Sequence, residues 1–131
     1  MLLVETRVGP SPIAGIGLFA LEPIKAGTRT WMFTPGFDQL FTEDQIAGLP
    51  PAARHQLETY TYRHAASGLF IFCIDNARFM NHADDPNTAG YHEGGRVEGY
   101  DTALRDIAAG EELTCDYRLF DAGYRKKLGF D

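Results

Sequence analysis

A polar stretch behind the most apolar run of the chain constrains the fold more than any other feature. Residues 69–74 read LFIFCI, a short run rich in aromatic and β-branched side chains. Such a run favours a buried strand over a helix, although periodicity alone does not separate the two. Residues 78–87 follow closely and read RFMNHADDPN, with many short polar side chains that suit turns and local backbone hydrogen bonds. Together they predict a polar binding loop carried on a buried strand.

Further strands and helices are predicted along the chain. Strands are expected where β-branched and aromatic residues lie between Gly and Pro breaks, at residues 3–8, 18–20, 28–33, 88–92, 96–100 and 113–115. Gly94 and Gly95 predict a hairpin turn between residues 88–92 and 96–100. Three helices are expected: one capped by Thr42 and ending near Ala47, one beginning at Pro50 and Pro51, and one over residues 120–128. Many short strands with a few small helices are typical of an α+β domain or a compact barrel.

Composition bounds the class of protein. The chain has 131 residues, which suits one domain, and its hydrophobic fraction of 44% is ordinary for a globular protein. Its net charge of −6 disfavours nucleic acid as a direct partner and suits a basic peptide or protein. No apolar run has membrane-spanning length and the first residues lack a secretory pattern, so we expect a cytoplasmic protein without a membrane partner. Cys73 and Cys115 are expected to be buried, reduced thiols.

Three motifs in order resemble the signature of SET-domain protein-lysine methyltransferases. Residues 78–87 resemble R-F-x-N-H-x-x-x-P-N, residues 110–117 (GEELTCDY) resemble G-E-E-L-x-x-x-Y, and residues 11–20 (SPIAGIGLFA) resemble the family's first motif. A lone Gly-x-Gly would be weak, but three ordered motifs are a specific signal. The resemblance implies a single SET domain over residues 1–131. It also implies a mainly β, α+β fold of several small sheets, a β-clip with a C-terminal pseudoknot.

The same resemblance implies an enzyme that transfers a methyl group from S-adenosylmethionine to a lysine amine of a protein. We expect the protein substrate to present an accessible lysine, in a basic segment, and we leave the oligomeric state open, with a homodimer as one option. Residues 118–131 would form a C-terminal tail in place of the Cys-rich zinc cluster that follows this motif in some relatives. No separate domain before the SET domain is expected.

Site residues follow from the motifs that they occupy. By resemblance, the cofactor would be bound by residues of the first two motifs, namely Ile16, Gly17, Arg78, Phe79, Asn81 and His82. Tyr117 is the expected catalytic residue, whose hydroxyl would orient the amine or the transferring methyl group. An aromatic channel for the substrate lysine would be formed by Tyr60, Tyr62, Phe120 and Tyr124.

Two other functions are weighed. A binding-only module would keep the fold and recognise a peptide without turnover, although the retained Tyr117 gives no sign of lost catalysis. A metal site is the second, since ligand types crowd one span: His82, Asp84, Asp85, His92 and Glu93. Neighbouring aspartates lack the alternate spacing of a calcium loop, and no zinc-type His or Cys pair accompanies them, so we expect no metal.

Overall fold

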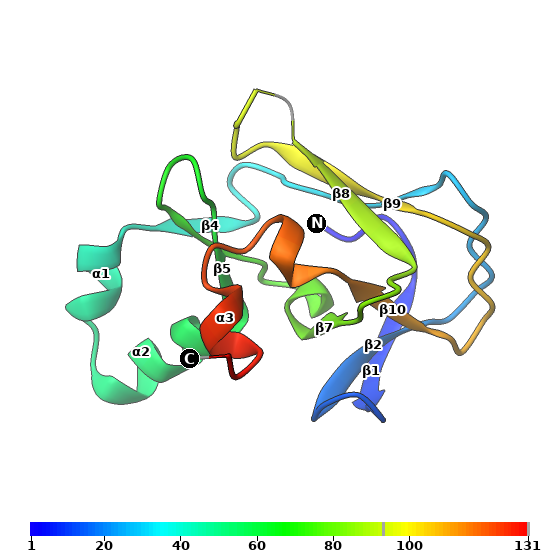
Figure 1. Ribbon diagram of the computed structural model, residues 1–131, viewed down its shortest axis with the longest axis horizontal. Helices are drawn as coiled ribbons and strands as arrows, with labels where there is room; N and C mark the ends of the chain where they lie inside the picture. Colours follow the sequence, from blue (N-terminus) through cyan, green and yellow to red (C-terminus); the bar gives the residue numbers. More distant parts are fainter. Residues whose placement is uncertain (93, 131) are drawn as a thin grey trace.

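Small β-sheets make up most of the protein. The computed structural model describes residues 1–92 and 94–130, and it groups most strands into one four-stranded and two three-stranded sheets. Helices α1 and α2 gather at one end of the molecule, and the hairpin of β1 and β2 projects from its lower edge, away from α1 (Figure 1). The expected fold class, a mainly β, α+β domain of several small sheets with short helices, is therefore confirmed.

The four-stranded sheet joins the two ends of the sequence. Its strands in spatial order are β1 (Thr6–Pro10), β2 (Ile16–Ala20), β10 (Glu112–Cys115) and β7 (Asn81–His82). β10 runs antiparallel to β2, with Leu113 opposite Leu18, and parallel to β7, with Thr114 opposite Asn81. The polar loop predicted at residues 78–87 thus contains a short strand. The first strand also runs through Pro10, later than expected, because an edge strand tolerates a residue that cannot donate to the ladder.

The other sheets confirm the buried strand. One contains β3 (Arg29–Met32), β9 (Gly99–Ala103) and β8 (Thr88–His92), and the other contains β4 (Gln39–Phe41), β6 (Phe70–Phe72) and β5 (Thr61–Arg63). β6 is the central strand of its sheet, and its Ile71 is fully buried, as expected for the apolar run.

The predicted hairpin exists, but its second strand begins three residues later than predicted. β9 starts at Gly99, opposite His92, and not at Arg96. A Cβ at Gly99 would lie 2.6 Å from the Tyr91 carbonyl oxygen, so only glycine fits where the strands begin to pair.

Two of the three predicted helices are confirmed. α1 (Glu43–Ala47) has the expected capping box, in which Gln45 N donates to Thr42 Oγ1 and Thr42 N donates to Gln45 Oε1. α2 (Pro51–Tyr60) carries proline at its first position. Neither of these, nor any other helix in the described part of the chain, has the length and apolarity to cross a membrane.

The third helix is much shorter than predicted. Instead of a helix over residues 120–128, the chain forms a 3₁₀ turn, η2 (Tyr117–Leu119), and then α3 (Tyr124–Lys127). The Asp121 carboxylate is the reason, because its Oδ1 accepts from Gly123 N at 2.8 Å and from Arg63 N at 3.0 Å. These bonds hold residues 121–123 in a turn against β5, so the helix begins only afterwards.

A buried asparagine fastens the end of the polar stretch to β10. Asn87 is 1% exposed; its Nδ2 donates to the Glu112 carbonyl oxygen at 2.7 Å, and its Oδ1 accepts from Thr114 N at 2.8 Å. Both bonds satisfy backbone groups of a strand inside the main core, which packs around Leu18 and Leu113. The motifs at residues 78–87 and 110–117 are therefore held together by side-chain hydrogen bonds as well as by strand pairing.

Candidate functional site

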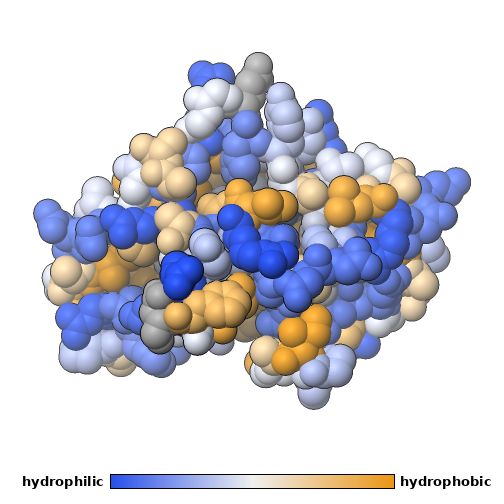
Figure 2. Space-filling view, in the orientation of Figure 1, coloured by the Kyte–Doolittle hydropathy of each residue, from blue (hydrophilic) through white to orange (hydrophobic). Residues whose placement is uncertain are grey.

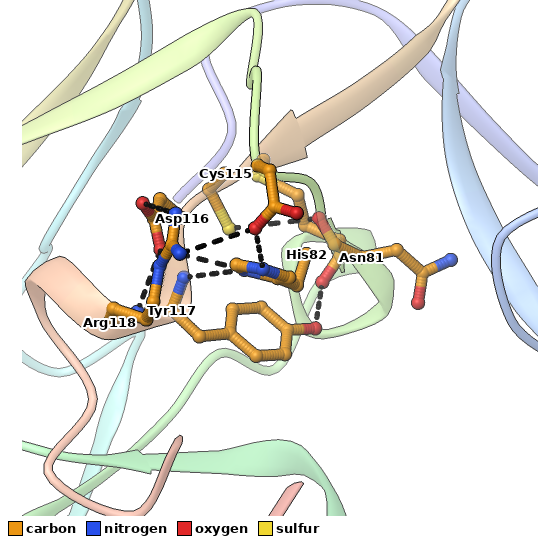
Figure 3. A network of polar contacts seen from close by, with 8 residues as sticks. Asn81, His82, Cys115, Asp116, Tyr117 and Arg118 are labelled. Carbon is orange, nitrogen blue, oxygen red and sulfur yellow. Dashed lines mark hydrogen bonds and ion pairs between the residues drawn. The ribbon is translucent and has the colours of Figure 1, made fainter. Parts of the chain in front are cut away.

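The parallel pairing of β7 with β10 places the polar motif beside the tyrosine motif. His82 lies opposite Cys115, and the chain turns after Asp116 into η2, which carries Tyr117. Figure 3 shows the His82 ring between Asp116 and Tyr117, whereas the Asn81 side chain points away from them. Successive residues of a strand face opposite sides of the sheet, so the side chains of Asn81 and His82 contact different parts of the protein.

Asn81 anchors the first motif. Its Nδ2 lies within hydrogen-bond distance of three acceptors, the carbonyl oxygens of Ala14 (3.0 Å) and Ile16 (3.3 Å) and Glu112 Oε2 (3.0 Å). Glu112 also accepts from Ser11 Oγ at 2.8 Å. Residues 11–16 are thereby fixed against the central sheet by one amide and one carboxylate.

Gly17 is required by this same arrangement. A Cβ at Gly17 would lie 2.5 Å from Glu112 Oε2 and 2.9 Å from Ser11 Cβ, closer than real contacts allow. The Glu112 carboxylate therefore takes the space that any other residue at position 17 would need.

His82 links the two motifs through its ring. Its Nδ1 accepts from Tyr117 N at 3.2 Å, and its Nε2 lies 3.3 Å from Asp84 Oδ1. An accepting Nδ1 has a free lone pair, so the ring proton is on Nε2, toward Asp84. Arg118 completes the cluster, with ion pairs to Asp84 (3.3 Å) and Asp116 (2.8 Å). Its hydrogen bonds hold the pKa of the Asp116 carboxyl below the usual range.

Tyr117 is half-buried at the centre of the site. Its hydroxyl donates to the Met80 carbonyl oxygen at 2.5 Å (Figure 3), and its ring meets the Phe120 ring edge-on at 6.0 Å. Burial raises the pKa of the phenol above its usual value, so the hydroxyl remains protonated at neutral pH. The oxygen therefore donates one hydrogen bond to the backbone and keeps lone pairs for an acceptor role.

A small aromatic pocket lies on one side of Tyr117. Its volume is about 80 Å³, and its lining includes Tyr60, Tyr62, Tyr117 and Phe120 together with Arg78. Tyr62 and Phe120 stack edge to face with centroids 5.2 Å apart, and burial raises the pKa of Tyr62 above its usual value. The pocket is small and partly aromatic, and its lining also carries charged side chains that include Asp101, Asp121 and Lys127, which suits an alkyl chain that ends in an amine better than a nucleoside.

An open groove of about 580 Å³ lies on the other side. It is lined by Ile13 and Ala14 from the first motif, by Asn81 and His82, and by Leu128 beyond α3. Figure 2 shows this hollow between the tip of the β1–β2 hairpin and α3. Its volume lies in the range of sites for cofactor-sized ligands. The groove and the pocket share Thr59, Tyr117 and Lys127, so they meet at the tyrosine.

Most of the predicted site residues converge here, and some take other places. Arg78 lines the small aromatic pocket rather than the groove, and its Nη1 donates to the Ile74 carbonyl oxygen at 2.9 Å. Phe79 packs edge-on against Tyr60 at 5.3 Å. Tyr124 opens α3 and lines neither hollow.

The proposed metal ligands do not form a cluster. Within residues 1–92 and 94–130, no group of three His, Cys, Asp or Glu side chains could hold a metal ion. Glu93, one of the ligand types in that span, lies outside the described residues.

Sequence reasoning missed several residues of the pocket, three of which surround one ion pair. Thr61, Asp121 and Lys127 all line the pocket. No motif includes them, and Asp121 and Lys127 lie in a tail where a short helix was expected. Only the fold shows that this tail returns to the aromatic residues.

The chain is similar in sequence to proteins of known type. The relatives include the histone-lysine N-methyltransferase ATX2 of Arabidopsis thaliana, 30% identical over 89% of this chain and 11% of that protein. Another is the histone-lysine N-methyltransferase, H3 lysine-4 specific, of Saccharomyces cerevisiae, 54% identical over 33% of this chain and 4% of that protein. The chain thus spans a small part of each of these relatives.

The fold is also shared with a solved structure. Polycomb Repressive Complex 2 of Chaetomium thermophilum, in an autoinhibited conformation bound to S-adenosylmethionine, superposes with a TM-score of 0.68 at 25% identity. The match covers 97% of this chain and 17% of that one. The family model described as SET domain matches residues 15–118, which include the second and third motifs, the groove residues Asn81 and His82, and Tyr117. On that match, which spans most of its length, the chain belongs to the SET domain family.

Proposed function

We propose that this chain is a methyltransferase that moves a methyl group from S-adenosylmethionine to the side-chain amine of a lysine in a protein. The observation that carries this proposal is the meeting of an open groove and a narrow aromatic pocket at Tyr117. A transfer between two substrates needs separate sites with a common point of contact. The groove would take the cofactor and the pocket the lysine.

The groove residues suit the cofactor. Asn81 uses its Nδ2 on protein acceptors, and no hydrogen bond within the described residues engages its Oδ1, which is left to accept from an ammonium group. His82 and the backbone of Ile13 and Ala14 line the same groove. When bound, the cofactor supplies a methyl group activated by a positive sulfonium. Ile16 and Gly17 support this site indirectly, by holding the first motif against Asn81 and Glu112.

Tyr117 would position the reacting amine. Its hydroxyl is fixed by the bond to the Met80 carbonyl, so its lone pairs face a constant direction without reorganisation during the reaction. Positive charge passes to the amine during transfer, and oxygen acceptors at the site stabilise it. A free lysine amine titrates at about pH 10.4, and desolvation among aromatic rings lowers that value toward the neutral form that can react. Tyr60, Tyr62 and Phe120 would exclude water from the amine.

The substrate would be a lysine in a basic segment of a protein. The net charge of −6 favours such a partner over nucleic acid. Relatives that are named histone-lysine methyltransferases make a histone-like tail a reasonable first substrate to test. A cytoplasmic location stays a prediction from the sequence.

Calorimetric titration with S-adenosylmethionine, and separately with its demethylated product, tests the cofactor assignment. We expect saturable binding that weakens about tenfold or more in Asn81→Ala, the size expected when one hydrogen bond to a charged group is lost. Asn76→Ala is a matched control, because Asn76 lies on η1 (Asn76–Phe79) and lines neither hollow. Equal affinity in Asn81→Ala and wild type would remove Asn81 from the cofactor site.

Transfer of a labelled methyl group to lysine peptides tests the reaction itself. Cofactor binding with incorporation into lysine supports the enzyme. Peptide binding without cofactor binding would instead support the binding-only module, because that function needs the pocket and not the groove.

A further inference from the structure

We propose that Asp121, the Thr61 carbonyl and the Tyr117 ring form an ammonium-binding site where the aromatic pocket meets the groove, and that Lys127 fills it until a substrate lysine displaces it. This inference rests on the proposed function and deepens it, since it assigns the group that receives the substrate's charge. Lys127, Asp121, Thr61 and Tyr117 all line the small aromatic pocket. The chain thus holds one of its own lysines where a substrate lysine is expected.

The Lys127 ammonium makes the contacts of a bound ligand. Its Nζ donates to the carbonyl oxygen of Thr61, lies 2.8 Å from Asp121 Oδ2, and stands 5.7 Å from the centre of the Tyr117 ring. Carboxylate, carbonyl and aromatic face are the groups that together recognise an alkylammonium. The acceptors are buried, since Thr61 is 2% and Asp121 3% exposed, whereas the Lys127 side chain keeps 24% of its surface exposed.

Asp121 explains why the site needs a cation. Its Oδ1 is engaged by the backbone N–H groups of Arg63 and Gly123, whereas its Oδ2 is buried and receives no well-directed hydrogen bond from a described group. Lys127 therefore balances the charge of Oδ2 without satisfying it fully. A buried carboxylate strongly disfavours loss of a counter-charge, so Lys127 leaves Asp121 only when another cation takes its place. A lysine that enters along the aromatic walls brings that cation.

The element that carries Lys127 is lightly held. α3 (Tyr124–Lys127) has four residues and no side-chain cap at its start, and it contains no buried residue. A helix of this length has little stability of its own. The contacts of the Lys127 side chain are thus a principal tie between α3 and the pocket, and the same side chain stands at the border with the groove. Exchange of one ammonium for another would free α3 while Asp121 remains paired.

The site binds the amine in its charged resting form. Methyl transfer requires the neutral amine, and pairing with Asp121 favours the charged one. The amine therefore leaves Asp121 and releases its proton to bulk water before it reacts beside Tyr117. Asp121 therefore acts as a positioning residue that receives the substrate's charge on entry.

Amine labelling of the wild-type protein tests the exchange without any mutation. Reductive methylation followed by mass spectrometry would compare Lys127 with Lys25, an exposed lysine that lines neither hollow. The probe is Nα-acetyl-lysine methylamide, and the matched norleucine derivative lacks only the amine. We expect Lys127 to be protected, and saturating lysine probe to raise its labelling by about threefold or more while the norleucine probe does not. Unchanged or reduced Lys127 labelling at saturation would overturn the proposal.

A second measurement uses Lys127→Met, with Lys25→Met as its control. Removal of the internal occupant should tighten binding of the lysine probe about tenfold, because a competent site is then populated in all molecules. Cofactor affinity is measured beside it. Two outcomes refute the ammonium site while the proposed function stands, provided that the cofactor binds. In one, the lysine probe binds Lys127→Met no more tightly than wild type. In the other, the probe binds neither protein. If the wild-type protein does not bind the cofactor at all, that result counts against the proposed function instead.

Discussion

Replacement of Tyr117 by phenylalanine separates the structural and chemical roles of its hydroxyl. The substitution removes one bond, from the hydroxyl to the Met80 carbonyl oxygen at 2.5 Å, and keeps the ring and the backbone N–H that His82 accepts. Met80 is 7% exposed, so its carbonyl loses a partner that water does not easily replace. We expect a loss of about 1–2 kcal/mol of unfolding free energy.

The same change should reduce methyl transfer far more than it reduces stability. Loss of a fixed oxygen at the reacting centre typically lowers turnover by about 10²–10³-fold. Cofactor affinity should stay within about twofold of wild type, because Asn81 and His82 keep all their contacts and every 1.4 kcal/mol is a tenfold change in affinity. Thermal melting, calorimetry and a single-turnover transfer assay measure the three quantities.

Tyr91→Phe provides the matched control. Tyr91 is 52% exposed and lines neither hollow, so its variant should change stability by less than about 0.5 kcal/mol and leave turnover unchanged. Equal turnover in Tyr117→Phe and Tyr91→Phe would refute the role of the Tyr117 hydroxyl. If the melting temperature of Tyr117→Phe falls so far below that of Tyr91→Phe that the variant is unfolded in the assay, the hydroxyl is mainly structural.

Two further predictions concern the sheet around the site. Gly17→Ala places a methyl group 2.5 Å from Glu112 Oε2 and 2.9 Å from Ser11 Cβ and should destabilise the protein by about 1–3 kcal/mol in urea unfolding; a stability equal to that of wild type would contradict the steric reason. Burial raises the pKa of Asp101 to about 6, so the folded state holds this proton more tightly than the unfolded state. The stability that Asp101 contributes is therefore present below about pH 4 and is lost as the pH rises through about 6. Asp101→Asn should be more stable than wild type at pH 7, by up to ~2 kcal/mol, with the difference shrinking toward pH 4; a difference independent of pH would show that Asp101 does not titrate in this range.

Local sequence rules predicted most of the secondary structure, and their failures have physical causes. The capping box at Thr42 and the proline start of α2 depend on neighbours within one turn, so they were predictable. The final helix was overextended because the Asp121 turn depends on Arg63, a residue far away in the sequence. The same long-range contact hides the pocket role of Lys127.

The site was predicted only as far as its motifs reach. Asn81, His82 and Tyr117 were found by resemblance, and strand pairing brings them together. The spacing of the motif did not explain why residue 17 is glycine. The structure does, because the Glu112 carboxylate on the neighbouring strand occupies the space that a Cβ would need. Roles in catalysis and cofactor binding for these residues stay predictions, because they depend on the experiments described above.

The position of β10 has a consequence for how the protein is made. This strand comes late in the sequence, yet it lies between β2 and β7 in the finished sheet. During synthesis, both neighbours wait with unpaired edges until β10 leaves the ribosome, and open edges of this kind invite pairing with other chains. Closing such distant contacts is also slow. Expression yield should therefore depend on chaperones that shield β2 and β7 during this interval, and the site exists only after the last strand has been inserted.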